Sequence, residues 1–330
     1  MTGFSASTVS RVLNDKGEQC RISTRTTKKI LKAAADYNYY PNRIARGLRL
    51  ERTETIGFVV PDIANPYFSS IAKTIEVESR KRGYSIFLCD SLDDISTEKE
   101  LLNLLAGRRV DGIILAPVGI DSGHVTDFRR RGIPIIIIDR YLPDSGIPYV
   151  TSDNYSGARQ AVEYIISMGH RDIACIQGLN GISLNSDRVR GYMDSLVKNG
   201  IKAEKSLIVG DDFGEECGYI QARLLLGRKT RPTAIFALSN LISLGVMRAT
   251  AEMGLKIPDD ISLVSFDEQP YSALLASPMT TVEQSINEIA RIAVNMLFDT
   301  IAGGNKEGRI KNIMLRPSLI IRSSVKNLLA

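Results

Sequence analysis

The sequence predicts an α/β protein in which a helical head precedes two lobes, each built on a doubly wound parallel sheet. From residue 55 onward, short apolar runs alternate with helical stretches, and this alternation occurs twice. The runs are almost continuously apolar, as strands are when helices cover both faces of their sheet. The segment before them is strongly basic instead. A chain of 330 residues exceeds what one core usually holds, so two or three domains are expected.

The composition argues against a disordered or membrane-spanning chain. Hydrophobic residues make up 44% and charged residues 24%, and no apolar run approaches the roughly 18 residues needed to span a bilayer. The first residues show no secretory signal pattern. The four cysteines lack CxxC spacing and only His124 and His170 could join them as ligands, so we expect a cytoplasmic protein with no metal and no cofactor. We interpret both histidines as surface residues near helix ends.

The positive charge is concentrated at the N-terminus. Residues 1–52 contain 11 Lys or Arg and 4 acidic residues, a net charge of +7, whereas the other 278 residues contain 31 basic and 33 acidic groups, a net charge of −2. A basic head on a nearly neutral body is typical of nucleic-acid binding, because neutralising phosphates releases counterions. Charge alone is equally compatible with a solvated basic terminus.

Residues 5–14 predict an amphipathic helix with one face free to contact DNA. Val9, Val12 and Leu13 recur at helical spacing on the other face, and Ser5 is the expected N-cap. Small residues near the start of the helix would let its backbone sit deep in a major groove. Arg11 could then donate to the O6 and N7 atoms of a guanine. The residues of this helix that we expect to contact DNA are Ala6, Ser7, Thr8, Ser10 and Arg11.

A second helix is expected over about residues 23–37, capped by Ser23. Its inward-facing residues are predicted to be Ile30, Ala34 and Tyr37. The lysines of this helix suit phosphates rather than bases.

Residues 41–53, PNRIARGLRLERT, predict a marginal helix of two turns. Pro41 closes the preceding element, and Asn42 can cap the helix. So short a helix does not persist alone in water, and Gly47 weakens it by about 1 kcal/mol relative to alanine. A helix that enters the minor groove needs arginines and an apolar residue such as Leu48 that can open a base step. We therefore expect this helix to become ordered on DNA. The alternative is a basic interdomain linker.

Three strings together resemble the lactose-repressor and galactose-repressor family of transcription regulators. They are STVSRVLN, YYPNRIARGLR and TIGFVVPDIANPYF, in that order and at family-like separations, and the likeness continues along essentially the whole chain. The resemblance implies a repressor whose operator affinity is controlled by a small ligand, with a sugar as the preferred candidate. The residues that match the family's base-reading helix, its hinge helix and its intercalating leucine are Ala6, Ser7, Arg11, Asn42, Arg43, Ala45 and Leu48.

The head departs from the family pattern in two places. The family begins with another helix before the glycine turn, whereas this sequence starts at the turn, so we expect a misassigned start or a trimmed chain. The loop NDKGEQCR between the two helices is also longer than usual. The alternative function is a sugar-binding receptor protein that lacks effective DNA binding because the first head helix is absent.

Polar residues stand where the predicted strands of the body end. The expected strands are TIGFVV, YSIFLC, DGIILA, IPIIII, DIACIQ, SLIV, TAIFAL and ISLVSF. Ligands of such sheets bind beyond the carboxyl ends of the strands, so these ends are candidates for a site. The residues at those ends are Pro61-Asp62, Cys89-Asp90, Ala116-Pro117, Asp139-Arg140, Gln177-Gly178, Ser239-Asn240 and Asp267-Glu268.

The chemistry of the strand ends favours sugar recognition over catalysis. No GxGxxG, glycine-rich GK[ST] loop or HExxH occurs, so we expect no enzyme and assign no catalytic residue. Carboxylates, amides and an arginine beside aromatic rings suit vicinal hydroxyls. By resemblance to the repressor family and to periplasmic sugar-binding proteins, the effector site contains Asn65, Tyr67, Phe68, Asp139, Arg140, Arg188, Asn240, Asp267 and Gln284. Ser239 replaces the family's usual asparagine and Ala116 replaces a polar residue, so the ligand stays open, with a pentose or hexose preferred.

Two of these assignments have plain structural alternatives. Tyr67 and Phe68 could simply pack at the first turn of a helix. Asp139 and Arg140 could form an ordinary ion pair.

The resemblance also implies the division of the chain. A helix-turn-helix head would occupy residues 1–40, and a hinge helix with its linker residues 41–54. The first periplasmic-binding-protein-like lobe would combine 55–151 with 285–311, and the second 152–284 with 312–330, with crossings near 151–153, 283–285 and 311–313. Because no heptad repeat follows Arg322, we expect a homodimer on a near-palindromic double-stranded operator and no membrane partner.

Two other function classes predict different features. A transport receptor for sugars would share the body but carry a signal peptide instead of the basic head. An α/β enzyme using Asp139 or Asp267 as acid or base would need a nucleophile, a cofactor loop or a metal set, and the sequence indicates none.

Overall fold

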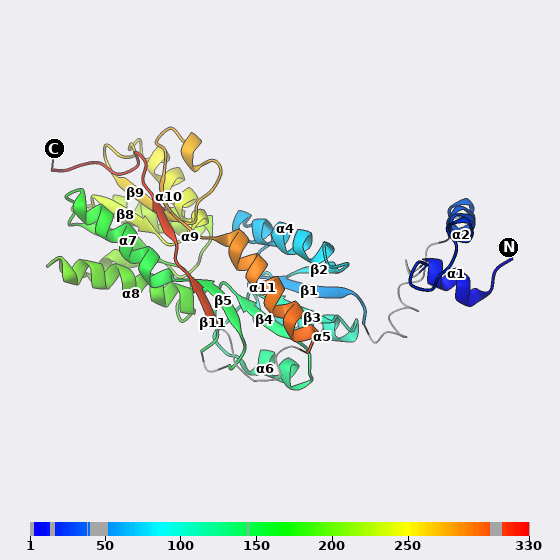
Figure 1. The fold of residues 1–330 in the computed structure, drawn as a ribbon. Helices are drawn as coiled ribbons and strands as arrows, with labels where there is room; N and C mark the ends of the chain where they lie inside the picture. The colour runs from blue at the N-terminus through cyan, green and yellow to red at the C-terminus, as the bar shows by residue number, and fades with distance from the viewer. Residues whose placement is uncertain are drawn as a thin grey trace. The chain divides into compact units, whose positions relative to one another are not determined.

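The computed structural model describes residues 3–13, 17–37, 39, 52–143, 145–303 and 312–329 (Figure 1). The chain forms two compact units, Met1–Glu54 and Thr55–Ala330. We call the first unit the head and the second the body. Within the described residues, no helix is both long enough and apolar enough to cross a membrane.

The described part of the head contains two packed helices, α1 (Ala6–Leu13) and α2 (Thr24–Asp36). Both begin with a serine cap: the Ser5 hydroxyl accepts from the amide of Thr8 at 3.2 Å, and the Ser23 hydroxyl accepts from the amide of Thr26 at 3.2 Å. These side chains satisfy amides that the first turn leaves without partners. The expected caps are therefore present.

The core of the head is small. Val12 of α1 and Ile30 of α2 are buried, and Ala34 is half-buried. The prediction that Tyr37 faces inward is wrong, because its side chain is 73% exposed. Tyr37 is the C-cap of α2, one residue beyond the helix, and the small core around Val12 and Ile30 does not extend to its side chain.

The body contains two six-stranded sheets of the same design. The first has the order β11-β5-β4-β3-β1-β2 and the second β12-β10-β9-β8-β6-β7. Each therefore carries the 2-1-3-4-5 order of a doubly wound sheet with one strand added beside its fifth strand. All pairings are parallel except that of β10 with β12.

Most of the first lobe comes from the N-terminal half of the body. Its elements are β1 (Thr55–Val60), α4 (Pro66–Arg80), β2 (Ser85–Asp90), α5 (Ile95–Gly107), β3 (Gly112–Leu115), α6 (Gly123–Arg130), β4 (Ile135–Ile138), β5 (Tyr149–Ser152), α11 (Ile286–Ile301) and β11 (Asn312–Leu315).

The second lobe follows β5 and is completed by the end of the chain. Its elements are α7 (Asn154–Ser167), β6 (Ile173–Ile176), α8 (Ser183–Lys198), η1 (Lys205–Leu207), β7 (Ile208–Val209), α9 (Glu215–Leu226), β8 (Ala234–Ala237), α10 (Asn240–Glu252), β9 (Ser262–Phe266), η2 (Ser272–Leu274), β10 (Thr280–Glu283) and β12 (Ser318–Ile320).

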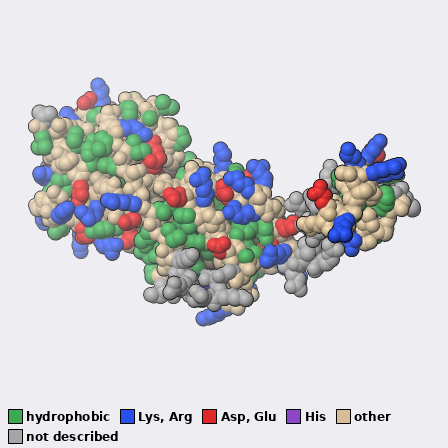
Figure 2. All heavy atoms as spheres, viewed as in Figure 1, with side chains coloured by type: hydrophobic (Ala, Val, Ile, Leu, Met, Phe, Trp, Pro, Cys, Tyr) green, Lys and Arg blue, Asp and Glu red, His purple; other side chains and the backbone are tan. Residues whose placement is uncertain are grey.

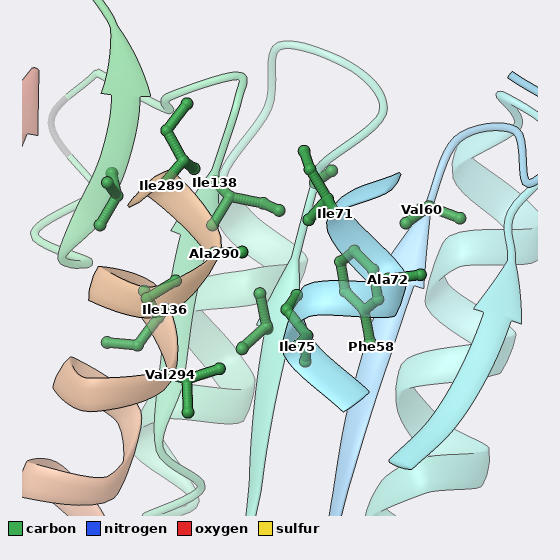
Figure 3. Close-up of a cluster of buried hydrophobic side chains, with 14 of the residues drawn as sticks. Phe58, Val60, Ile71, Ala72, Ile75, Ile136, Ile138, Ile289, Ala290 and Val294 are labelled. Atoms are coloured by element: carbon green, nitrogen blue, oxygen red, sulfur yellow. The ribbon is translucent and has the colours of Figure 1, made fainter. Parts of the chain in front are cut away.

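Successive residues of the apolar strands pack into hydrophobic clusters on opposite faces of the sheet. Both faces are therefore buried, which explains why the strand sequences are apolar throughout. In β1, Phe58 and Val60 pack with α4 and α11, whereas Val59 packs with α5 and α6 on the other face. Figure 3 shows the first of these clusters, where Ile75 of α4 and Val294 of α11 lie over the sheet. In the second lobe, α7 and α8 cover one face and α9 and α10 the other.

The end of the chain crosses between the lobes later than expected. The expected crossing at 311–313 would assign Asn312–Leu315 to the second lobe, but these residues form β11, which pairs in parallel with β5 of the first sheet. Only Ser318–Ile320 pairs with β10. The chain changes sheets at Arg316 and Pro317, because proline has no amide hydrogen to continue a ladder.

Both histidines are buried, which corrects the expectation that they lie on the surface. The His124 Nε2 lies 2.5 Å from the Glu98 carboxylate, and the two side chains are 8% and 0% exposed. His170 is 1% exposed, with its ring nitrogens 2.9 Å from the Thr233 hydroxyl and 3.0 Å from the Lys326 carbonyl. The partners of His170 satisfy both of its ring nitrogens, whereas the Nδ1 of His124 has no hydrogen-bond partner in the described structure.

Candidate functional site

A cavity of about 310 Å³ lies between the two lobes of the body, where the strands of both sheets end. This volume is at the lower end of the range of small-molecule pockets. Its polar lining consists of Asp62, Asn65, Asp90, Asp93, Asp139, Arg140, Arg188, Asp212, Ser239, Asp267 and Gln284. Its apolar lining and one glycine are Pro61, Tyr67, Phe68, Leu92, Leu184, Phe213, Gly214 and Leu241.

Tyr67 lines this cavity, and its hydroxyl oxygen is fully buried. Its side chain lies at the start of α4, and its ring meets that of Phe68 edge to face with centroids 5.1 Å apart. Burial and the charges of Asp139 and Asp267 raise the pKa of the phenol well above its usual value of 10.0, so it remains protonated. The hydroxyl oxygen has no hydrogen-bond partner in the described structure. Such a group is costly unless a ligand or water satisfies it.

Asp267 and Arg188 form the second-lobe part of the floor. The Asp267 carboxylate accepts from the Gln284 amide at 2.5 Å. Burial raises the pKa of Asp267 above its usual 3.8 despite the opposing effect of Arg188, and burial likewise lowers the pKa of Arg188 below 12.5. The two groups therefore stabilise each other's charge in a site that disfavours both.

The guanidinium of Arg188 is fixed by three contacts inside the second lobe. Its Nε donates to the Asn154 side chain at 2.8 Å, and an Nη donates to the Leu238 carbonyl at 2.5 Å. Its Cζ lies 3.6 Å from the centroid of the Phe266 ring. Arg188 thus enters the cavity in a single held orientation.

Arg140 belongs to the first lobe and links three parts of the wall. One Nη donates to the Asp93 carboxylate at 3.0 Å and to the Pro117 carbonyl at 3.3 Å. Its Nε lies 3.9 Å from Asp139. Its Cζ lies 5.7 Å from the centroid of the Phe213 ring, which comes from the second lobe. Asp139 and Arg140 are an ion pair, and both also line the cavity.

Two amides and a tyrosine connect the lobes directly. Asn65 caps α4 by accepting from the Tyr67 amide at 3.0 Å, and the same oxygen accepts from the Asn240 side chain of the second lobe at 3.2 Å. Tyr141 follows β4; its amide donates to the Ser183 hydroxyl at 3.0 Å and its hydroxyl donates to Asp187 at 3.1 Å. The lobes are therefore in contact on both sides of the cavity.

The structure brings the predicted effector residues together with one exception. Eight of them line the cavity, namely Asn65, Tyr67, Phe68, Asp139, Arg140, Arg188, Asp267 and Gln284. Asn240 is absent from the lining, but its side chain donates to Asn65 and its backbone hydrogen-bonds to Asp267. Ser239, its neighbour, lines the cavity instead and caps α10 by accepting from the amide of Ile242 at 3.1 Å.

Several lining residues were missing from the predicted set. Asp62 and Asp90 were named among the candidate strand ends but were not assigned to the effector set, and both line the cavity. Asp93, Asp212 and Phe213 lie in loops, where no pattern in the sequence marks them.

The predicted DNA-contacting face of α1 is largely exposed. Ala6, Ser7 and Arg11 are exposed, whereas Val12 on the opposite face is buried. Thr8 and Ser10 are half-buried, and the Thr8 hydroxyl lies 2.8 Å from that of Ser5. The hinge residues Asn42, Arg43, Ala45 and Leu48 lie outside the described residues.

The second helix of the head adds positive charge. Figure 2 shows Lys and Arg side chains gathered where α2 lies. The exposed basic residues of this helix are Arg25, Lys28, Lys29 and Lys32. The exposed positive charge of this helix suits contacts with phosphates rather than with bases.

Comparison with known proteins matches both units. Residues 1–42 match the family model described as bacterial regulatory proteins, lacI family, and residues 53–320 match the model described as periplasmic binding proteins and sugar binding domain of LacI family. The HTH-type transcriptional regulator DegA of Bacillus subtilis is 33% identical over 99% of this chain and 96% of its own length. The ribose operon repressor of Halalkalibacterium halodurans is 34% identical over 90% of this chain and 87% of its own.

A solved structure shows the same fold over nearly the whole chain. The lac repressor dimer bound to operator and the anti-inducer ONPF has a TM-score of 0.86 at 26% identity, covering 98% of this chain and 96% of that one. The family model of the body alone spans more than half of the sequence. The chain therefore belongs to the LacI family of bacterial regulatory proteins, whose members are DNA-binding transcription regulators and not enzymes.

Proposed function

We propose that this chain is a repressor that binds a near-palindromic operator as a homodimer in the cytoplasm and that a small sugar in the inter-lobe cavity controls its operator affinity. The single observation that carries the effector part is the inter-lobe cavity, where six carboxylates and two guanidinium groups from both lobes stand beside the rings of Tyr67, Phe68 and Phe213. Sugar hydroxyls can both donate to carboxylates and accept from guanidinium groups. The described cysteines are free thiols, which agrees with a reducing compartment.

The parts of the chain take the following roles in this proposal. Residues 1–40 read DNA, with Ala6, Ser7, Thr8, Ser10 and Arg11 of α1 facing the major groove. Residues 41–54 form the hinge, with Asn42, Arg43, Ala45 and Leu48 at the minor groove. The first lobe comprises 55–151 and about 285–315, and the second comprises 152–284 and the segment from Ser318 onward.

A ligand in the cavity would couple to the head through the arrangement of the lobes. The walls come from both lobes, so a ligand that contacts both favours the closed arrangement by its differential affinity. Closure would then move the first lobes of a dimer relative to each other and shift the ordering of the hinge, which needs only a few kcal/mol. Whether the sugar loosens or tightens the operator complex depends on which arrangement the hinge requires.

Fluorescence anisotropy on DNA from the promoter region of the chain's own gene tests the DNA part. The chain should be assayed as given and also preceded by any in-frame upstream residues, at two salt concentrations. Arg11→Ala should weaken specific binding by about 1–3 kcal/mol and relax preference at one base pair, whereas Lys29→Ala should weaken binding to all sequences and lower the salt dependence. Absence of specific binding by both forms at low salt would overturn the repressor assignment and favour a sugar-binding receptor.

A further inference from the structure

The cavity contains an excess of negative charge. Six carboxylates and two guanidinium groups line it, and no lysine or histidine is among its described lining residues. The carboxylates extend from the buried floor to the exposed mouth. They are Asp139 and Asp267 on the floor, Asp62 and Asp90 at half depth, and Asp93 and Asp212 at the mouth.

Both guanidinium groups are already engaged by the protein. Arg140 pairs with Asp93 at 3.0 Å and lies 3.9 Å from Asp139. Arg188 donates to Asn154 and to the Leu238 carbonyl while its plane covers the Phe266 ring. A phosphate or carboxylate ligand is usually held by a guanidinium whose paired N–H groups point at it. Here protein acceptors occupy part of each guanidinium, although the buried Nε of Arg140 has no hydrogen-bond partner in the described structure.

Helix N-termini are the other common anion sites, and most of those at the cavity are occupied by side chains. Asn65 accepts from the first turn of α4 and Ser239 from that of α10. Asp94 accepts from the Thr97 amide of α5 at 2.7 Å. Asp212 accepts from the Gly214 amide, at the N-cap of α9, at 2.6 Å. Of the helices at the lining, α8 and α9 begin without a side-chain cap bond, and the carboxylate of Asp212 lies at the start of α9.

The acceptors of the cavity fit an uncharged polyol instead. The carboxylates can accept from several hydroxyls, and the side-chain amide of Gln284 is also among the lining groups. The rings of Phe68 and Phe213 supply apolar surface for the CH groups of a sugar.

We infer that the cavity selects an uncharged monosaccharide and excludes the phosphate and carboxylate derivatives of the same sugar. The inference rests on the proposed function, since it concerns the effector of that site. An anion approaching the cavity meets carboxylates at every depth, and at short range this repulsion outweighs the contacts that its sugar part makes.

Matched ligand pairs test the inference on the intact chain. Thermal unfolding and calorimetric titration should compare D-ribose with ribose 5-phosphate, and D-glucose with both glucose 6-phosphate and glucuronate. At least one neutral sugar should raise Tm, and its anionic partners should bind about tenfold more weakly or worse. Tighter or equal binding of an anionic partner would overturn the inference, as would failure of every neutral sugar to bind.

Salt and charge variants separate electrostatic exclusion from a steric clash. Raising ionic strength should narrow the neutral-to-anionic affinity ratio, because it screens exposed charges such as those at the mouth. The double variant Asp62→Asn/Asp212→Asn should narrow the ratio as well. The matched control Asp127→Asn removes an exposed carboxylate on α6 that pairs with Arg130, and it should leave the ratio unchanged. A ratio insensitive to both salt and the double variant would mean that shape, not charge, excludes the anion.

The operator assay distinguishes this inference from the proposed function. If operator binding responds to an anionic sugar, the regulatory function stands and the charge selectivity is wrong. If no sugar of either kind affects a specific operator complex, the proposed control by a sugar is itself wrong.

Discussion

Asp139 and Asp267 occupy equivalent places in the two lobes, each directly after the fourth strand of its sheet and each with a positive φ. Their φ angles are 64° and 74°. The amide of each donates to the fifth strand of the same lobe: Asp139 to Val150 at 3.2 Å and Asp267 to Val282 at 3.0 Å. Left-handed backbone is uncommon outside glycine, although asparagine and aspartate adopt it more readily than other residues. This shared turn places both carboxylates in the same cavity.

Substitutions at Asp139 should separate the backbone requirement from the charge. Asp139→Asn keeps a residue that tolerates positive φ, whereas Asp139→Val introduces a β-branched one. Urea unfolding should show the valine variant less stable than the asparagine variant by about 1–3 kcal/mol. The same two changes at Asp127, a residue of α6 without positive φ, should differ much less. Equal stabilities at Asp139 would show that the turn imposes no strain.

Tyr141→Phe should weaken effector binding by loosening the contact between the lobes. The change removes the hydroxyl that donates to Asp187 across the lobes at 3.1 Å. Burial raises the pKa of this phenol to about 12, so the hydroxyl remains a donor at physiological pH. Loss of one such bond costs about 0.5–1.5 kcal/mol, or roughly two- to tenfold in affinity measured by titration with the effector.

Tyr155→Phe provides the matched control for that experiment. The Tyr155 hydroxyl donates to Asp194 at 3.0 Å, and both residues belong to the second lobe. Its loss should leave effector affinity unchanged. Equal losses in the two variants would indicate that Tyr141 acts on general stability and not on lobe closure.

Gly178→Ala should reduce effector affinity by displacing Phe213. A Cβ on Gly178, just after β6, would overlap the Phe213 ring, and that ring lines the cavity. Phe213 is half-buried, so the ring can move while the fold survives. Calorimetric titration should show weaker binding, with a smaller change in the free energy of unfolding.

A double-mutant cycle checks this explanation. In a Phe213→Ala background the alanine at 178 has no ring to displace, so its effect on affinity should largely disappear. The control Gly107→Ala adds a methyl group at the end of α5, where no atom lies within 4 Å, and should leave binding intact. An undiminished effect in the Phe213→Ala background would contradict the displacement.

His170 should make the body sensitive to acid. Burial lowers the pKa of its imidazole below the usual 6.5. Because the folded state disfavours the protonated ring, His170 contributes stability above about pH 6.5 that is lost as the pH falls through its folded pKa. Urea midpoints of the wild-type protein should therefore drop as the pH falls below about 6.5.

His170→Asn removes that titration. The variant should be less stable than the wild-type protein near pH 8, because the ring links Thr233 to the Lys326 carbonyl, but the difference should shrink as the pH falls. Parallel pH curves for the two proteins would rule out a role of this ring in acid sensitivity.

The α/β architecture could be predicted from the sequence because most strands are buried on both faces. Strands such as Ile135–Ile138 read as uninterrupted apolar runs. The strands Tyr149–Ser152 and Thr280–Glu283 were missed, since threonine and glutamate interrupt the apolar pattern next to the lobe crossings. The strand Asn312–Leu315 was assigned to the wrong lobe, because its alternating pattern fits an edge position in either sheet.

The lining residues that follow recognisable strands could be predicted from the sequence, whereas those that lie in loops could not. Asp139 and Asp267 follow recognisable strands, so their convergence follows from sheet topology. Phe213 reaches the cavity because a glycine elsewhere in the lobe leaves room for its ring, a tertiary fact without a local signal. Asn240 and Ser239 show that one step along the chain decides which side chain lines the cavity and which one lies behind it.

The late crossing at Arg316 and Pro317 has a consequence for how the protein is made. The strand β11 completes the first sheet, after the helix α11, and Ser318–Ile320 completes the second. Neither lobe therefore has all of its strands until almost the whole chain has left the ribosome. Pairings between segments so distant in sequence form slowly. Premature termination between β10 and β11 would therefore leave both sheets without their last strand, and termination between β11 and β12 would leave the second sheet without it, which favours aggregation and degradation over a functional fragment.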